Sequence, residues 1–167
     1  MDNPHQTIML FGTFDQLHAG HENLFMQAKS LARHFQNPLT VAIVARDKTV
    51  KQIKRKKPDN SEKKRVKSLE ETGWTDLVLL GEKTDKYKAI RKHRPSIIAL
   101  GYDQFAFTQQ LEKLIIDLNL DAKIVRLDPY KPDIYKSSLI KQRNAQSLSI
   151  PTPKKSSTIK SFKLSKK

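Results

Sequence analysis

The sequence predicts an α/β protein with a parallel sheet of about five strands and helices on both faces. Short apolar segments typical of strands alternate along the chain with segments whose apolar residues recur at helical spacing. The segment at 39–44 is apolar at almost every position, as expected for a strand that is buried on both faces of a parallel sheet. Repeated strand–helix–strand units therefore account for most of the chain.

Each element in the first half of the chain follows from a local pattern. Strands are expected at 7–11, 39–44 and 77–80, and helices at 22–32 and 61–71. A basic segment at 51–58 contains many lysines and ends at Pro58, so we expect it to be a loop. Asp59, Asn60 and Ser61 come next and can cap the second helix.

The second half repeats the alternation. Strands are expected at 97–100 and 122–127, and helices at 84–93, at 107–118 and from Ser137 or Ser138 to 147. Pro95 ends the first of these helices, because the residue before a proline is disfavoured in the helical conformation. The segment at 128–135 contains two prolines and is expected to be a loop.

The composition indicates one globular domain, expected at 1–148, followed by a basic disordered tail at 149–167. Lysine, serine, threonine and proline dominate the tail, which therefore has little apolar surface to bury. The chain has no cysteine, which excludes disulfides, thiolate catalysis and zinc bound by cysteine. No apolar run approaches the roughly 20 residues of a membrane helix, and residues 1–5 lack the features of a secretory signal. We therefore expect a cytoplasmic protein.

The net charge of +15 favours a polyanionic partner, such as a nucleotide, a nucleic acid or an anionic membrane surface. One concentration of basic residues lies in the tail, where we expect a solvated charge run. A second concentration lies at 48–67, inside the expected domain. Because this second group sits near the carboxyl end of a strand, it is the better candidate for binding an anion.

The stretch Gly12–His21, which we call the signature segment, lies between an expected strand and an expected helix. The first backbone N–H groups of a helix and the positive end of its dipole favour an anionic group. His18 and His21 fall on one side of the first turn, and each offers an N–H donor. Gly20 lacks a side chain, which would allow a ligand to approach closely.

This segment resembles the Gly-Thr-Phe-Asp-x-x-His-x-Gly-His signature of the cytidylyltransferase-like nucleotidyltransferases. The segments at 41–51, 55–65 and 100–104 resemble archaeal-type FAD synthases. The segment at 136–140 resembles the closing motif of the same family, with Lys136 in place of its first serine. The resemblance covers residues 7–145 and implies a Rossmann-like fold of the HxGH nucleotidyltransferase type.

The resemblance also implies the reaction and the residues that carry it. A phosphate oxygen of an acceptor would attack the α-phosphate of a nucleoside triphosphate, and pyrophosphate would leave. His18, His21 and Lys57 are the expected catalytic residues. The expected nucleotide-binding residues are Thr13, Phe14, His18, Ala19, Gly20, His21, Arg65, Asp103, Tyr130, Ser137 and Ser138. Asp15 and Asp47 could hold a divalent metal, Mg²⁺, which takes one or two carboxylates together with substrate phosphates.

Several of these residues have structural alternatives that the sequence leaves open. Lys57 and Arg65 could be solvated surface residues, and Asp103 could be a turn residue. Phe14 and Tyr130 could pack in the core or in loops rather than on a nucleotide. The two serines could cap the last helix as well as bind phosphate. His5, His34 and His93 have no matching context and are expected at the surface.

The substrates are predicted from the segments that follow the later strands. Gly101–Gln104 resembles FAD synthases, which implies ATP as the nucleotide, FMN as the acceptor and FAD as the product. One alternative is a cytidylyltransferase that joins CTP to glycerol 3-phosphate or another small phosphate. A second alternative is a non-catalytic, basic nucleic-acid-binding protein, although no recognised nucleic-acid-binding motif is present. A membrane is not an expected partner, and the resemblance suggests a homodimer.

Overall fold

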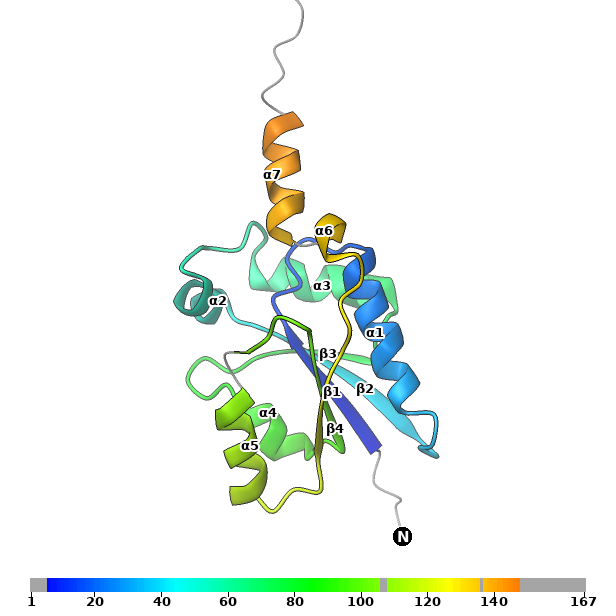
Figure 1. Ribbon diagram of the computed structural model, residues 1–167. Helices are drawn as coiled ribbons and strands as arrows, with labels where there is room; N and C mark the ends of the chain where they lie inside the picture. The colour runs from blue at the N-terminus through cyan, green and yellow to red at the C-terminus, as the bar shows by residue number, and fades with distance from the viewer. Residues whose placement is uncertain (1–5, 106–107, 136, 148–167) are drawn as a thin grey trace, which may run out of the picture.

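The computed structural model describes residues 6–105, 108–135 and 137–147, which contain a five-stranded parallel sheet (Figure 1). The strand order is β3-β2-β1-β4-β5, which places β1 at the centre. Along the β1–β2 pair, Gln6 lies opposite Pro38 and Gly12 lies opposite Val44. The strands are β1 (Gln6–Gly12), β2 (Pro38–Val44), β3 (Leu77–Leu80), β4 (Ile97–Leu100) and β5 (Lys123–Arg126). The predicted fold class is confirmed.

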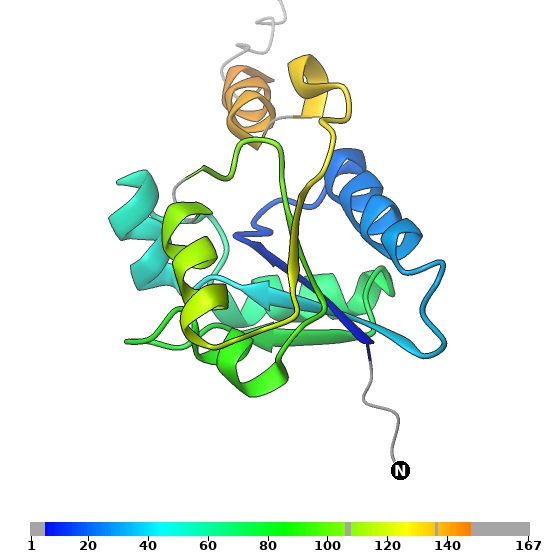
Figure 2. The same ribbon diagram turned by 60° about the horizontal axis from the view of Figure 1, so that its bottom comes forward.

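Helices cover both faces of this sheet. Figures 1 and 2 show α1 and α3 on one face, α4 and α5 on the other, and α2, α6 and α7 near the carboxyl end of β1. The helices are α1 (Ala19–Leu31), α2 (Asp47–Lys54), α3 (Glu62–Thr72), α4 (Lys88–His93), α5 (Thr108–Asp117), α6 (Pro132–Tyr135) and α7 (Ser137–Ser147). Within the described ranges, none of them has the length and the apolar composition needed to cross a membrane.

The core has two apolar layers, one on each face of the sheet, and alternate residues of β1 enter different layers. Ile8 and Leu10 pack with Phe25 of α1 and Leu69 of α3. Met9 faces the opposite layer, whose members are Met9, Val41, Ile43, Ile90, Ile98, Leu100 and Leu111. Burial on both faces explains why the sequence of β1 and β2 is almost continuously apolar.

The structure differs from the prediction in two basic or proline-containing segments. Part of the expected loop at 51–58 belongs to α2, whose Val50 is buried, so tertiary burial stabilises a helix that carries few apolar residues. The expected loop at 128–135 contains the single turn α6. The predicted tail at 149–167 lies outside the described residues.

Candidate active site

A cavity of about 690 Å³ lies at the carboxyl ends of the strands. Its lining comes from the signature segment, the segment around α2, the loop after β4, the segment at 128–135 and α7. These are the segments that the predicted parallel sheet brings to one edge, and ligands bind at this edge in open α/β sheets. The volume is within the range of small-molecule and cofactor sites.

His18 and His21 lie beside each other in this cavity, with their ring centroids 4.0 Å apart. His18 is the N-cap of α1, and its Nδ1 accepts a hydrogen bond from the backbone N–H of Gly20 at 3.1 Å. The neutral imidazole of His18 therefore carries its proton on Nε2. The Nδ1 atom of His21 is buried and has no hydrogen-bond partner within the part of the chain that the structure describes.

Burial keeps both histidines neutral near pH 7. It lowers the pKa of His18. Burial, followed by the positive charges of His18 and Lys54, lowers the pKa of His21 to about 3. Both rings can then act as N–H donors without being charged. A phosphate at this position would raise both pKa values, because an opposite charge favours the protonated imidazole.

Two glycines of the signature segment leave room for aromatic rings. A Cβ atom added to Gly20 would lie 2.9 Å from the ring of His18, so the missing side chain is required by the histidine as well as by any ligand. A Cβ atom on Gly12 would lie 2.5 Å from the ring of Phe14. Phe14 is 3% exposed and packs against Phe25 and His21. It lines the cavity, but it is mainly a core residue that supports His21.

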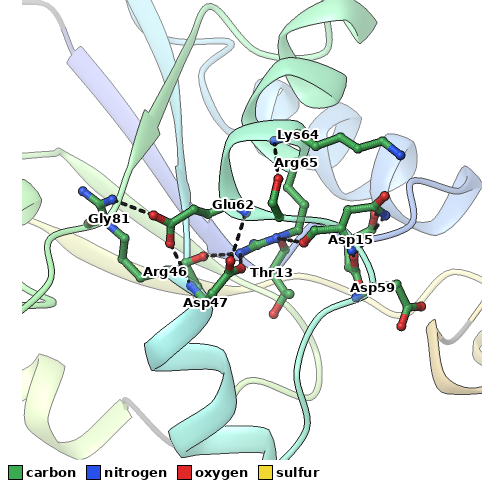
Figure 3. A network of polar contacts seen from close by, with 12 residues as sticks. Thr13, Asp15, Arg46, Asp47, Asp59, Glu62, Lys64, Arg65 and Gly81 are labelled. Atoms are coloured by element: carbon green, nitrogen blue, oxygen red, sulfur yellow. Dashed lines mark hydrogen bonds and ion pairs between the residues drawn. The ribbon is translucent and has the colours of Figure 1, made fainter.

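The prediction that Arg65 binds phosphate is not supported. Its side chain is completely buried and does not line the cavity. Its guanidinium donates to the backbone carbonyls of Thr13, Asn60 and Ala45 and to the carboxylate of Asp47. Figure 3 shows it between Asp47 and Thr13. Arg65 therefore holds the signature segment against α2 and α3 from behind the site.

The carboxylates of Asp15 and Asp47 are both engaged by protein donors, so they do not fit the predicted role as metal ligands. Asp47 accepts from Arg65 at 2.7 Å and does not line the cavity. Asp15 lines the cavity, but its oxygens accept from Lys141 at 2.7 Å and from the backbone N–H groups of Asp59 and Asn60. A metal ion would have to displace these donors.

The remaining predicted residues divide into three groups. Those that line the cavity are Thr13, Lys57, Asp103 and Tyr130. Ala19 begins α1 without lining the cavity. Ser137 and Ser138 begin α7, but their side chains lie outside what the structure describes. Contact of these residues with a nucleotide stays a prediction.

The cavity lining includes residues that the sequence analysis did not select, and Lys54, Tyr135 and Lys141 are polar examples. Tyr135 stacks on His18 with ring centroids 6.1 Å apart. Desolvation lowers the pKa of Lys54, although the charge of Asp103 acts in the opposite direction. Lys54 is one of many lysines around α2, and only helical geometry turns it toward the site. Lys141 and Tyr135 carry no local signal, because their partners are distant in the sequence.

Together, the fold and the cavity define an α/β protein with a cavity beside a helix N-terminus on the carboxyl edge of a parallel sheet, a position that favours an anionic ligand. The model of the Cytidylyltransferase-like family matches residues 9–143. The chain therefore belongs to the cytidylyltransferase-like family.

Two relatives and one solved structure refine this placement. An FAD synthase from Korarchaeum cryptofilum is 37% identical over 135 residues, which are 81% of this chain and 89% of the relative. An FAD synthase from Methanothermus fervidus is 41% identical over 123 residues, which are 74% and 83% of the two chains. A crystal structure from Thermoplasma volcanium, described as a lipopolysaccharide core biosynthesis protein, is 34% identical with a TM-score of 0.67. It covers 75% of this chain and 98% of its own. The predicted resemblance is confirmed.

Proposed function

We propose that this protein is an adenylyltransferase that joins ATP and FMN to give FAD and pyrophosphate. The observation that carries the proposal is the pair of neutral imidazoles at the N-terminus of α1, inside a cavity at the carboxyl edge of the sheet. Its specific substrates are supported by the similarity to proteins named FAD synthase over most of the chain.

In the proposed reaction, an oxygen of the FMN phosphate attacks the α-phosphorus of ATP. The bond between the α-phosphorus and the bridging oxygen breaks, and that oxygen leaves with pyrophosphate. The protein contributes alignment and charge stabilisation rather than covalent chemistry. His18 and His21 donate from their N–H groups to the phosphoryl oxygens, and the positive end of the α1 dipole favours the same phosphates. Lys54 and Lys57 reduce the repulsion between the two anions, since both line the cavity.

Mg²⁺ enters this proposal as a part of the substrate. Asp15 and Asp47 are held by Lys141 and Arg65, so neither carboxylate is available to bind a resident ion. Mg²⁺ retains several waters and is readily carried by the phosphates of a nucleotide. The expected substrate is therefore the Mg²⁺ complex of ATP.

The test is product analysis by chromatography, combined with pyrophosphate release, over a matrix of triphosphates and phosphorylated acceptors. We expect FAD from ATP and FMN, and its loss in the double variant His18→Ala/His21→Ala. Faster formation of CDP-glycerol from CTP and glycerol 3-phosphate would replace the proposal with the cytidylyltransferase alternative. Tight oligonucleotide binding at physiological salt without turnover would favour the non-catalytic alternative.

The site of action and the assembly are part of the same proposal. We infer a cytoplasmic homodimer from the sequence resemblance. Analytical ultracentrifugation of the full chain tests the assembly, and a monomer at micromolar concentration would contradict it.

A further inference from the structure

The cavity reaches both faces of the sheet, and its two sides differ in chemistry. On the side of α1 it is lined by Leu24, His18 and His21 together with the loops after β4 and β5. Those loops lie against α1. Gln27 is hydrogen-bonded to Asp128 through both its amide nitrogen and its amide oxygen. This side therefore offers two imidazoles and the carboxylates of Asp103 and Asp128.

The opposite side is apolar. Five lining residues belong to the core layer beneath α4 and α5 or pack against it, and they are Phe11, Ile43, Ile90, Leu100 and Leu111. Val50 and Ile53 of α2 continue this surface, which we call the apolar wall. Ile53 is 46% exposed although it lines the cavity, so an apolar ligand would remove its surface from water.

Two polar side chains that precede α4 also line the cavity. Lys86 and Tyr87 line the cavity, and their Nζ and phenol groups both contact Oε1 of Gln110 at 2.9 Å. The ammonium of Lys86 also lies 5.0 Å from the centroid of the Tyr87 ring. The cavity thus contains a polar cluster as well as the apolar wall, and in this cluster the Tyr87 hydroxyl already donates to Gln110.

We propose that the apolar wall binds the isoalloxazine ring of the acceptor, while ATP binds on the α1 side. This inference rests on the proposed function. Isoalloxazine combines an apolar dimethylbenzene portion with an edge of carbonyl oxygens and ring nitrogens, which matches a cavity that has both a broad apolar wall and polar side chains. The ribose hydroxyls and the exocyclic amine of ATP need acceptors, which Asp103 and Asp128 supply on the other side.

The same wall selects against a small polar acceptor. Glycerol 3-phosphate would leave this apolar surface in contact with water, whereas a flavin covers it. The phosphate-binding residues recognise the phosphate group, which all such acceptors share, so they cannot distinguish one acceptor from another. The difference in affinity between acceptors therefore arises at the wall. The residues that would determine specificity are Ile53 and Ile90 of the wall, together with Thr49 and Tyr87, which also line the cavity.

The test uses a matched pair of variants on α2. Thr49 lines the cavity, whereas Lys51 lies on the same helix, is exposed and does not line it. We expect Thr49→Trp to raise the KM for FMN by about tenfold or more while the KM for ATP stays within about twofold. Lys51→Trp should leave both values unchanged. Ile53→Asp, at a half-exposed position that tolerates polarity, gives a second test if Thr49→Trp does not fold.

Riboflavin separates this inference from the proposed function, because it carries the ring without the phosphate. Riboflavin fluorescence should be quenched by the wild-type protein and by Lys51→Trp, and much less by Thr49→Trp or Ile53→Asp. A rise in the KM for ATP, or an unchanged KM for FMN, would overturn the placement of the ring. A wild-type protein that makes no FAD would refute the proposed function, while loss of riboflavin quenching in Thr49→Trp would still support a flavin-binding wall.

Discussion

The ammonium of Lys141 on α7 lies 2.7 Å from the carboxylate of Asp15 in the signature segment and 2.9 Å from that of Asp59. Burial alone would raise the pKa of Asp15, but the hydrogen bonds from Lys141, Asp59 and Asn60 lower it to about 2. Burial likewise opposes the charge of Lys141, and its hydrogen bonds to the two carboxylates raise its pKa. One ion-pair cluster therefore joins α7 to the segment that carries the histidines.

The first prediction concerns this cluster. Lys141→Met should lower the free energy of unfolding by about 2–3 kcal/mol, because the Asp15 side chain, 5% exposed, loses a charged partner. It should also lower kcat, since the signature segment is no longer held against α7. Lys63→Met removes the charge of an exposed lysine on α3 and should change neither quantity. Urea denaturation and FAD formation are the two measurements. If Lys141→Met and Lys63→Met had the same free energy of unfolding and the same kcat, the ion-pair cluster would not support the site.

The second prediction concerns Arg65. Arg65→Lys should lower the free energy of unfolding by about 3–5 kcal/mol. The buried guanidinium of Arg65 donates to three backbone carbonyls and one carboxylate, and a single ammonium cannot replace all of these hydrogen bonds. Lys67→Met, on the exposed face of the same helix, should change stability by less than about 0.5 kcal/mol. A fully stable Arg65→Lys protein would contradict the structural role assigned to this residue.

The third prediction concerns the two histidines. His21→Ala should lower kcat by about a hundredfold or more, because it removes a donor to the transferred phosphoryl group. His18→Asn separates two roles of His18, since asparagine keeps the N-cap of α1 while the imidazole is lost. The His18→Asn variant should therefore have a lower kcat than wild type and the same free energy of unfolding. His34→Ala, at an exposed position outside the cavity, is the control. Near-normal turnover in both site variants would refute the proposed site.

The fourth prediction concerns pH. Burial lowers the pKa of His21 in the folded protein to about 3, below the ordinary histidine value of 6.5, so the unfolded chain binds more protons between these two values. The contribution of the neutral ring to stability is complete above pH 6.5 and is lost as the pH falls toward 3. In urea denaturation, wild type should lose about 1.6 kcal/mol more than His21→Gln between pH 6.5 and pH 5. If the free energies of unfolding of wild type and His21→Gln changed equally with pH, His21 would not be desolvated in the folded protein.

The sequence was sufficient to predict those parts of the site whose residues lie close together along the chain. His18, Gly20 and His21 lie between a strand and a helix that periodicity identifies, so their meeting at a helix N-terminus could be predicted. Arg65 could have been placed correctly as well. It precedes Leu69 by four residues, which puts both on the buried face of α3. Arginine is seldom fully buried, so the sequence analysis did not assign Arg65 to the buried face of this helix.

Other parts of the site depend on contacts that no local pattern records. Lys141 is 126 residues from Asp15 in the sequence, and their pairing arises only when α7 closes over the signature segment. The stacking of Tyr135 on His18 has the same origin. Helix α2 was missed because its basic sequence has little apolar periodicity, and burial of Val50 decides its conformation.

The fifth prediction concerns Gly20, where stability and activity should respond differently. A Cβ atom at this position would lie 2.9 Å from the ring of His18 and 3.3 Å from Cβ of Tyr135. Gly20→Ala must therefore displace the imidazole, and we expect kcat to fall by about tenfold or more. Stability should change little, because the roughly 0.5–1 kcal/mol that alanine gains over glycine in a helix offsets the loss of the N-cap hydrogen bond from the Gly20 amide to His18.

Gly73→Ala is the matched control, with the opposite expected pattern. Gly73 ends α3 with φ of +66°, and a Cβ atom there would have no neighbour within 4 Å. The variant should lose about 1 kcal/mol of stability through backbone strain and keep its kcat. For both variants, thermal melting measures stability and FAD formation measures kcat. If Gly20→Ala kept full activity, the space beside His18 would not be needed for catalysis, and the hydrogen bond from the Gly20 amide would be sufficient to orient the ring.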